Sequence, residues 1–155
     1  MKSILTCQGI TKSYGSGDII ENVLKQVDLE FFEGQASVLI GPSGSGKTTL
    51  LSILGCLLAP SEGQLLIADQ SVNFFDKSSL TEVRRQKLGF IFQHAQLLPF
   101  LTIEENLAIV GRNAGMNDAD IKQRLDNLLQ RLELQAMRYK HPNQLSGGQR
   151  QRVAI

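Results

Sequence analysis

Hydrophobic and polar positions follow two different patterns along the chain. Up to Phe92, apolar runs of strand length alternate with polar turns and helical stretches. Two β-rich stretches within residues 2–32, joined at "GSGD", predict an antiparallel ribbon. The run "ASVLI" at 36–40 predicts a fully buried strand, and "QLLIADQSV" at 64–72 and "LGFIF" at 88–92 predict two more.

Helical spacing separates these predicted strands. A helix is expected from about Lys47 to Leu58, because Pro60 and Gly63 interrupt the pattern after it. A short basic helix, "SLTEVRRQK" at 79–87, is expected to begin at a capping box of Ser79 and Glu82.

The pattern becomes almost entirely helical after Gln93. Thr102 and Glu105 have capping-box spacing, and Asn117 with Asp120 opens another helix. The apolar residues of that helix share one face: Ile121, Leu125, Leu128, Leu129 and Leu132. Strands that alternate with helices, followed by helices alone, predict an α/β core with a helical insert.

Composition narrows the class of protein. The 155 residues are 42% hydrophobic and 20% charged, which suits a globular domain, and the net charge of +1 argues against a broad electrostatic grip on nucleic acid or acidic lipid. Cys7 and Cys56 lack the spacing of a zinc site or disulfide framework and are expected to be buried thiols. No secretory signal or membrane-spanning run is evident, so we expect a cytoplasmic chain that is soluble by itself.

The stretch "GPSGSGKTTLL" at 41–51 fits the phosphate-loop pattern G-x-x-x-x-G-K-[ST] between a predicted strand and a predicted helix. Glycines let backbone amides converge on an anion, and the helix N-terminus adds a positive dipole end. Lys47 is expected to reach the β- and γ-phosphates, and Thr48 to hold Mg²⁺. The candidate nucleotide-binding residues are Gly41, Pro42, Ser43, Gly44, Ser45, Gly46, Lys47, Thr48 and Thr49.

A second motif, "LSGGQRQRVAI" at 145–155, resembles the signature sequence of ABC-type ATPases. It places a serine and two glycines where a helix begins, and so offers a hydroxyl and amides to an anion. The alternative is a capped helix end that touches no ligand. The resemblance implies that the motif contacts the ATP of a partner subunit through Ser146, Gly147, Gly148 and Gln149.

The same resemblance assigns further roles. Gln93 matches the Q-loop glutamine, which helps hold Mg²⁺ and water at the γ-phosphate and acts with Lys47 in catalysis. Tyr14 matches the aromatic residue that stacks on adenine, although a surface aromatic is the alternative. His94 and His141 match no γ-phosphate histidine and are expected to be solvated or structural.

The resemblance implies the fold as well: a phosphate-loop NTPase core with an N-terminal antiparallel β ribbon and a helical subdomain, its central sheet incomplete. The expected parts are an α/β core over 1–93, a helical subdomain over 94–147 and the start of the signature helix over 148–155. An apolar strand with an aspartate and a catalytic glutamate, which the family carries further along, is absent from the 155 residues. We therefore expect a piece of a longer subunit.

Across nearly the whole chain, the amino-acid sequence is most similar to the bacterial branch of lipoprotein-releasing, macrolide-export and cell-division ATPases. This implies ATP clamped head to tail between two ATP-binding subunits, and a transmembrane permease that keeps the pair at the inner face of the membrane. The apolar cluster at 97–101 is either core or a surface that receives a permease helix. The alternatives are a nucleotide-binding interaction module without hydrolysis or transport, and an ABC ATPase acting on DNA or ribosomes, which the near-zero charge disfavours.

Overall fold

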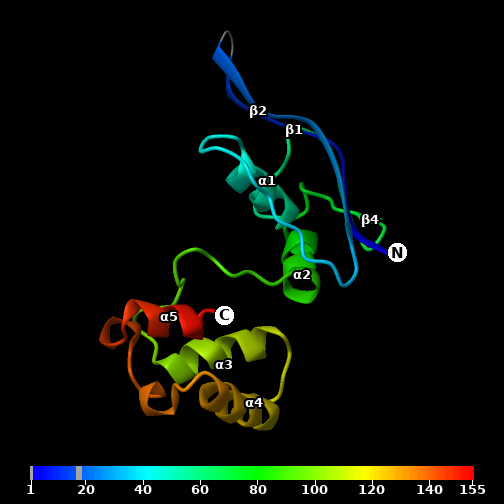
Figure 1. Cartoon of the computed structure of the whole chain (residues 1–155). Helices are drawn as coiled ribbons and strands as arrows, with labels where there is room; N and C mark the ends of the chain where they lie inside the picture. The colour runs from blue at the N-terminus through cyan, green and yellow to red at the C-terminus, as the bar shows by residue number, and fades with distance from the viewer. Residues whose placement is uncertain (1, 17–18) are drawn as a thin grey trace. The chain divides into compact units, whose positions relative to one another are not determined.

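The computed structural model describes residues 2–16 and 19–155, which form two compact units. The first unit ends at Leu88, and the second runs from Gly89 to Ile155 (Figure 1). Each unit is described by itself, and the subdomain boundaries expected at 93 and 147 remain predictions. Within the described residues, no helix is long and apolar enough to cross a membrane.

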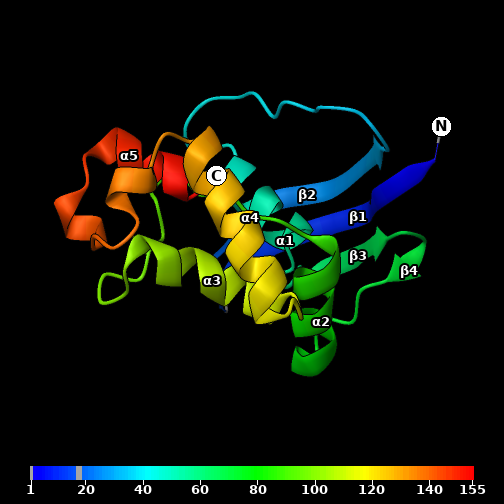
Figure 2. The same ribbon diagram turned by 90° about the horizontal axis from the view of Figure 1, so that it is seen from below.

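An antiparallel sheet forms the frame of the first unit. Its strands are β1 (Ser3–Ser16), β2 (Ile19–Phe32), β3 (Glu62–Ile67) and β4 (Gln70–Ser71), in the spatial order β2-β1-β3-β4 (Figure 2). The long β1–β2 pair confirms the predicted ribbon.

The prediction of a single strand over 64–72 is wrong. The chain turns back at Ala68 and Asp69, which have positive φ values of 49° and 62°, so that Ile67 pairs with Gln70. Two consecutive residues with positive φ are typical of a tight hairpin turn. The sequence "AD" lacks the glycine that usually signals such a turn, so the turn was not evident from the residues at 64–72.

Both helices of the first unit differ from their predicted bounds. Helix α1 (Lys47–Leu54) is shorter than predicted, because Cys56 has a positive φ of 55° and the Leu57 amide bonds back to the Ser52 carbonyl. Helix α2 (Lys77–Lys87) begins earlier than predicted.

The carboxylate of Asp76 caps α2 by accepting the amides of Ser78 and Ser79 at 2.9 and 3.2 Å. The hydrogen bond from the Ser78 hydroxyl contributes most to lowering the pKa of Asp76, and the bonds from these two amides contribute less. The capping box predicted at Ser79 and Glu82 is therefore wrong, because an acceptor upstream reaches the free amides first. Glu82 pairs with Arg85 instead.

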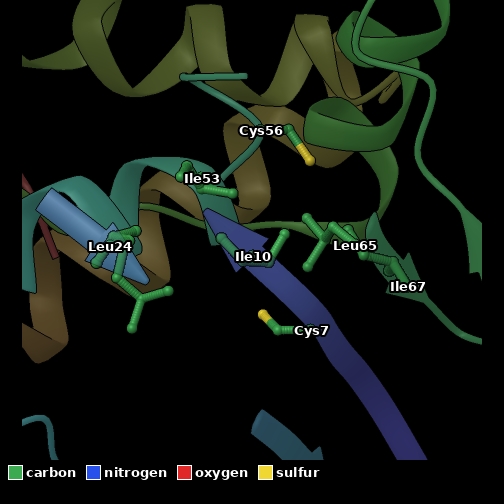
Figure 3. Packing of buried hydrophobic residues seen from close by; sticks show 8 residues of the cluster. Cys7, Ile10, Leu24, Ile53, Cys56, Leu65 and Ile67 are labelled. Carbon is green, nitrogen blue, oxygen red and sulfur yellow. The ribbon is translucent and has the colours of Figure 1, made fainter. Parts of the chain in front are cut away.

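The core of the first unit lies between α1 and the sheet. Ile10, Ile53 and Leu65 have no exposed surface, and Figure 3 shows them beside Cys7 and Cys56. Burial, with a smaller contribution from the Asp28 charge, raises the pKa of Cys7 to about 11, so the thiol stays protonated. The expectation of two buried free thiols is confirmed.

Two of the predicted strands are not formed. Residues 36–40 and 88–92 lie outside every helix and strand (Figure 1), and Val38 and Ile40 are 82% and 87% exposed. A buried strand needs a neighbour for its backbone amides and carbonyls. Within residues 2–16 and 19–155, no strand pairs with either run.

The second unit is helical, as predicted. It contains α3 (Ile103–Asn113), α4 (Asp118–Arg131), the short 3-10 helices η1 (Gln135–Met137) and η2 (Pro142–Gln144), and α5 (Gly147–Val153). The Thr102–Glu105 capping box and the Asn117 cap are confirmed. The predicted apolar face of α4 is confirmed as well. Its buried residues are Ile121, Leu125 and Leu129, and its half-buried residues are Leu128 and Leu132.

An ion pair joins two distant segments of this unit. Arg138 donates from Nε and Nη2 to the two carboxylate oxygens of Glu104, at 2.9 and 2.7 Å, and a third time to Asp126. These bonds lower the pKa of Glu104 and raise that of Arg138. The pair therefore fastens the segment after η1 to the first turn of α3.

Glu104→Gln should lower the free energy of unfolding at pH 7 by about 1 kcal/mol, because Arg138 loses a half-buried charged partner. Since the pKa of Glu104 is lowered in the folded state, its contribution is complete above the unfolded pKa and is lost as the pH falls through the folded value. Urea unfolding at several pH values would measure both effects. Glu133→Gln, whose ion pair with Arg152 is long and exposed, is the control and should change little.

Candidate nucleotide-binding site

A loop of residues 41–46 leads directly into α1 and forms the candidate site. Gly44 and Gly46 have φ values of 80° and 84°, a left-handed conformation that glycine adopts at low cost. Gly46 occupies the N-cap position of α1, and no side chain caps the helix there. The first amides of α1 are therefore left available to a ligand.

Gly46 also lies against β2. A Cβ at this position would stand 2.9 Å from Leu24 Cδ2 and 3.0 Å from the Val23 carbonyl oxygen. Both contacts are tight, the second is with backbone, and the left-handed φ adds strain for any other residue, so glycine is strongly favoured here. The sheet thus determines where the loop meets the helix.

Lys47 folds back over the loop. Its Nζ donates to the carbonyl oxygens of Gly41 and Pro42, at 2.8 and 2.6 Å, and to the Ser45 hydroxyl at 3.3 Å. The ammonium therefore lies among the loop's own acceptors. A hollow of about 520 Å³ adjoins it, lined by Val23, Ser43, Gly44, Ser45, Gly46, Lys47, Thr48 and Thr49.

The chemistry of this hollow suits a phosphate chain. It brings together a lysine, four hydroxyl side chains and the amides at a helix N-terminus, all of which favour an anion. The Thr48 hydroxyl belongs to the same lining and is of a kind that coordinates Mg²⁺ in phosphate loops. The residues present fit both a triphosphate and its magnesium ion.

Tyr14 lies near the end of β1, in the same unit, and is 45% exposed. The Nζ of Lys12 is 5.3 Å from the centre of its ring and donates to the Ala59 carbonyl at 2.8 Å. Among the described residues, those that line the hollow do not include Tyr14. The ring is available at the surface, and its stacking on adenine stays a prediction.

The signature residues cap α5. Ser146 Oγ accepts the Gln149 amide at 3.2 Å, and Gln149 Oε1 accepts the Ser146 amide at 2.8 Å. Gly147 and Gly148 are exposed beside them. Arg150 Nη1 donates to the Leu145 carbonyl at 3.0 Å and holds the entry to the helix. The capped helix end is observed, and contact with a partner's ATP stays a prediction.

Gln93 and the signature belong to the second unit, whereas the phosphate loop and Tyr14 belong to the first. Gln93 and His94 lie exposed in a loop between 88–92 and α3. The backbone amide of His141 donates to Gln144 Oε1 at 2.8 Å in the first turn of η2, a bond that does not involve the imidazole. The catalytic and metal-binding roles of Gln93 stay predictions.

Two residues of interest were missed by the sequence reasoning. Val23 lines the hollow from β2, and no motif marks it. Asn106 is a polar side chain buried in α3 at 7% exposure, bonded to the loop before that helix. Its position three residues after the buried Ile103 was a usable signal, since an asparagine on an apolar helix face needs partners.

The apolar cluster at 97–101 is divided between core and surface. Leu97 packs against the buried cluster of the second unit. Leu98 and Phe100 are 36% and 70% exposed. Neither of the two alternatives for this cluster describes all of it.

Comparison with known proteins agrees with this geometry. The family described as ABC transporter matches residues 24–155. An ABC transporter ATP-binding protein of Thermotoga maritima is 43% identical over all 155 residues, and a macrolide export ATP-binding/permease protein MacB of Marinobacter nauticus is 43% identical over 154. The chain spans 66% of the first relative's length and 24% of the second's.

Solved structures agree as well. The dimeric structure of MJ0796, a bacterial ABC transporter cassette, superposes with a TM-score of 0.88 at 40% identity, over 98% of this chain and 67% of that one. Its post-hydrolysis state, bound to ADP and phosphate, gives a TM-score of 0.87.

The fold and the loop define a mixed α/β protein of the phosphate-loop nucleotide-binding class. The chain belongs to the ABC transporter family, whose model matches it over residues 24–155. The predicted fold class is confirmed, with a four-stranded antiparallel sheet in the described residues and without the expected strands at 36–40 and 88–92.

Gly46→Ala should lower the stability of the first unit by about 2–3 kcal/mol, because the methyl group adds a clash with β2 to the cost of a left-handed alanine. Gly44→Ala is the matched control. Its φ is also left-handed, but its Cβ would meet nothing within 4 Å, so we expect a loss of about 1 kcal/mol. Urea unfolding of both variants would compare them, and equal losses would contradict the contact with β2.

Proposed function

We propose that this chain binds ATP with Mg²⁺ and, as part of an ABC transporter, couples nucleotide binding and hydrolysis to transport through a permease. The observation that carries the proposal is the hollow at the start of α1, where Lys47, hydroxyl side chains and free amides converge. Bound there, a triphosphate would replace the loop carbonyls as the partner of the Lys47 ammonium.

The proposed roles follow the matched motifs. Residues 41–49 hold the phosphates, with Lys47 on the β- and γ-phosphates and Thr48 on Mg²⁺. Gln93 completes the metal site and orients water, and Tyr14 stacks on adenine. The magnesium ion would neutralise negative charge on the phosphates as the bond to the γ-phosphate breaks.

Two subunits are proposed to bind ATP head to tail. Residues 41–49 of one copy and Ser146, Gly147, Gly148 and Gln149 of the other would enclose the same nucleotide. The exposure of both glycines and the similarity to a cassette solved as a dimer support this arrangement. No nucleic-acid partner is proposed, since the net charge is only +1.

The membrane partner is proposed to be a permease involved in export or lipoprotein release. The MacB relative is named as an ATP-binding/permease protein for macrolide export, which supports this direction. The exposed Leu98 and Phe100 offer an apolar surface for a permease segment. Docking there would hold the subunit at the inner face of the membrane.

Lys47→Ala should weaken ATP binding by about 2–3 kcal/mol, because the phosphates lose a charge-assisted hydrogen-bond donor. Titration with a fluorescent ATP analogue would measure the change. Lys77→Ala removes an equal charge from the exposed start of α2 and serves as the control. Unchanged affinity after the Lys47 substitution would contradict the site.

Tyr14→Ala should weaken ATP binding by about 1–3 kcal/mol through lost stacking and leave inorganic triphosphate binding unchanged. Calorimetric titration with ATP and with inorganic triphosphate measures the two affinities separately. Tyr139→Ala, a substitution of another exposed tyrosine, should affect neither ligand. Equal losses for ATP and triphosphate would argue against an adenine platform.

A further inference from the structure

The loop before α3 is built around one buried side chain, that of Asn106. Its Oδ1 accepts the Leu98 amide at 2.7 Å. Its Nδ2 lies within hydrogen-bond distance of the carbonyl oxygens of Leu98, Leu101 and Thr102, at 3.1, 3.2 and 2.9 Å. One side chain thus contacts the backbone at both ends of the loop.

Two of these groups, the Leu98 amide and the Leu101 carbonyl, have no backbone partner among the described residues. Residues 98–101 form a turn in which the Leu101 amide donates to the Leu98 carbonyl at 3.2 Å. The Leu98 amide has its partner in Asn106. The Leu98 amide is partly buried, so leaving it without an acceptor would cost about 1 kcal/mol, and the shape of the turn depends on this side chain.

We propose that Asn106 is a positioning residue that holds the 98–101 turn in one shape and so presents Leu98 and Phe100 together at the surface. The turn keeps Leu97 in the core of the unit while Phe100 remains 70% exposed. An exposed apolar side chain on an unsupported loop would collapse onto the nearest apolar surface. The hydrogen bonds to Asn106 prevent this without covering the ring.

The amide group is needed because it donates and accepts at the same place. A leucine, which has the same branching and number of side-chain heavy atoms, does neither, and a carboxylate accepts but places negative charge against three carbonyl oxygens. A protonated carboxyl regains one donor. Asn106→Asp therefore becomes a pH-dependent version of the same side chain.

The use of this turn as a docking surface for a permease segment rests on the proposed function. The positioning of the turn by Asn106 does not. A surface fixed before binding loses less conformational entropy when a partner docks. Substitutions at Asn106 should therefore weaken docking without removing either exposed apolar side chain.

The chain contains no tryptophan, so Phe100→Trp introduces a single indole in the turn. In this background, Asn106→Leu and Asn106→Asp should each lower the fluorescence anisotropy of the indole at pH 7, because the turn becomes mobile. Acidification should restore the anisotropy in the Asp variant, over a pH range in which the far-ultraviolet circular dichroism of the parent is constant. The parent and the Leu variant should show no such step.

Asn113→Leu, an exposed asparagine at the end of the same helix, is the matched control and should leave the anisotropy unchanged. Unchanged anisotropy in both Asn106 variants, or a loss without acid recovery in the Asp variant, would overturn the assignment. Should the Leu variant fail to fold, the pH reversal within one sample of the Asp variant still decides the question.

Docking is measured separately, as the share of the subunit that sediments with membranes of its source cells. Asn106→Asp and Phe100→Ser should both reduce this share, and Asn113→Leu should not. No change with Phe100→Ser would contradict docking on this turn, and the anisotropy would still report on Asn106. A reduction with Phe100→Ser alone would overturn the link between Asn106 and docking.

Discussion

Packing of α1 against the antiparallel sheet is the constraint on which the candidate site depends. A helix of eight residues is too short to be stable alone, so its position comes from Ile53, which is fully buried against Ile10 and Leu65. The same sheet constrains the start of the helix, because β2 lies within 3.0 Å of where a Cβ at position 46 would stand. Lys47, the next residue, is thereby held at the edge of the phosphate hollow.

How far the sequence predicted the structure depends on the range of the interactions involved. The phosphate loop and the caps at Thr102 and Asn117 were predictable, because each is made within a few residues. The runs at 36–40 and 88–92 have strand composition, but a strand also needs a pairing partner, which composition does not supply. The turn at Ala68 and Asp69 was hidden because neither residue is a glycine.

The second unit shows the same limit for side chains. The Ser146–Gln149 cap spans three residues, and its motif was evident. Arg138 and Glu104 lie 34 residues apart, so their pair depends on the tertiary fold of the helices. Asn106 is intermediate: its helical position was predictable, but its partners lie in an irregular turn whose shape it determines itself.

The contrast between Lys47 and Asn106 suggests how binding energy is distributed. Lys47 already bonds to neutral carbonyls, so a triphosphate gains only the difference between a charged and a neutral acceptor, and solvent screens both. The free amides of α1 are therefore expected to share the proposed phosphate binding with Lys47. Asn106 needs no such exchange, because its hydrogen bonds to the backbone of Leu98 and Thr102 would remain if a permease segment docked on the outside of the turn. The first side chain is arranged to change partners and the second to keep them, which is expected where one unit carries a site for an exchangeable ligand and the other carries a surface of fixed shape.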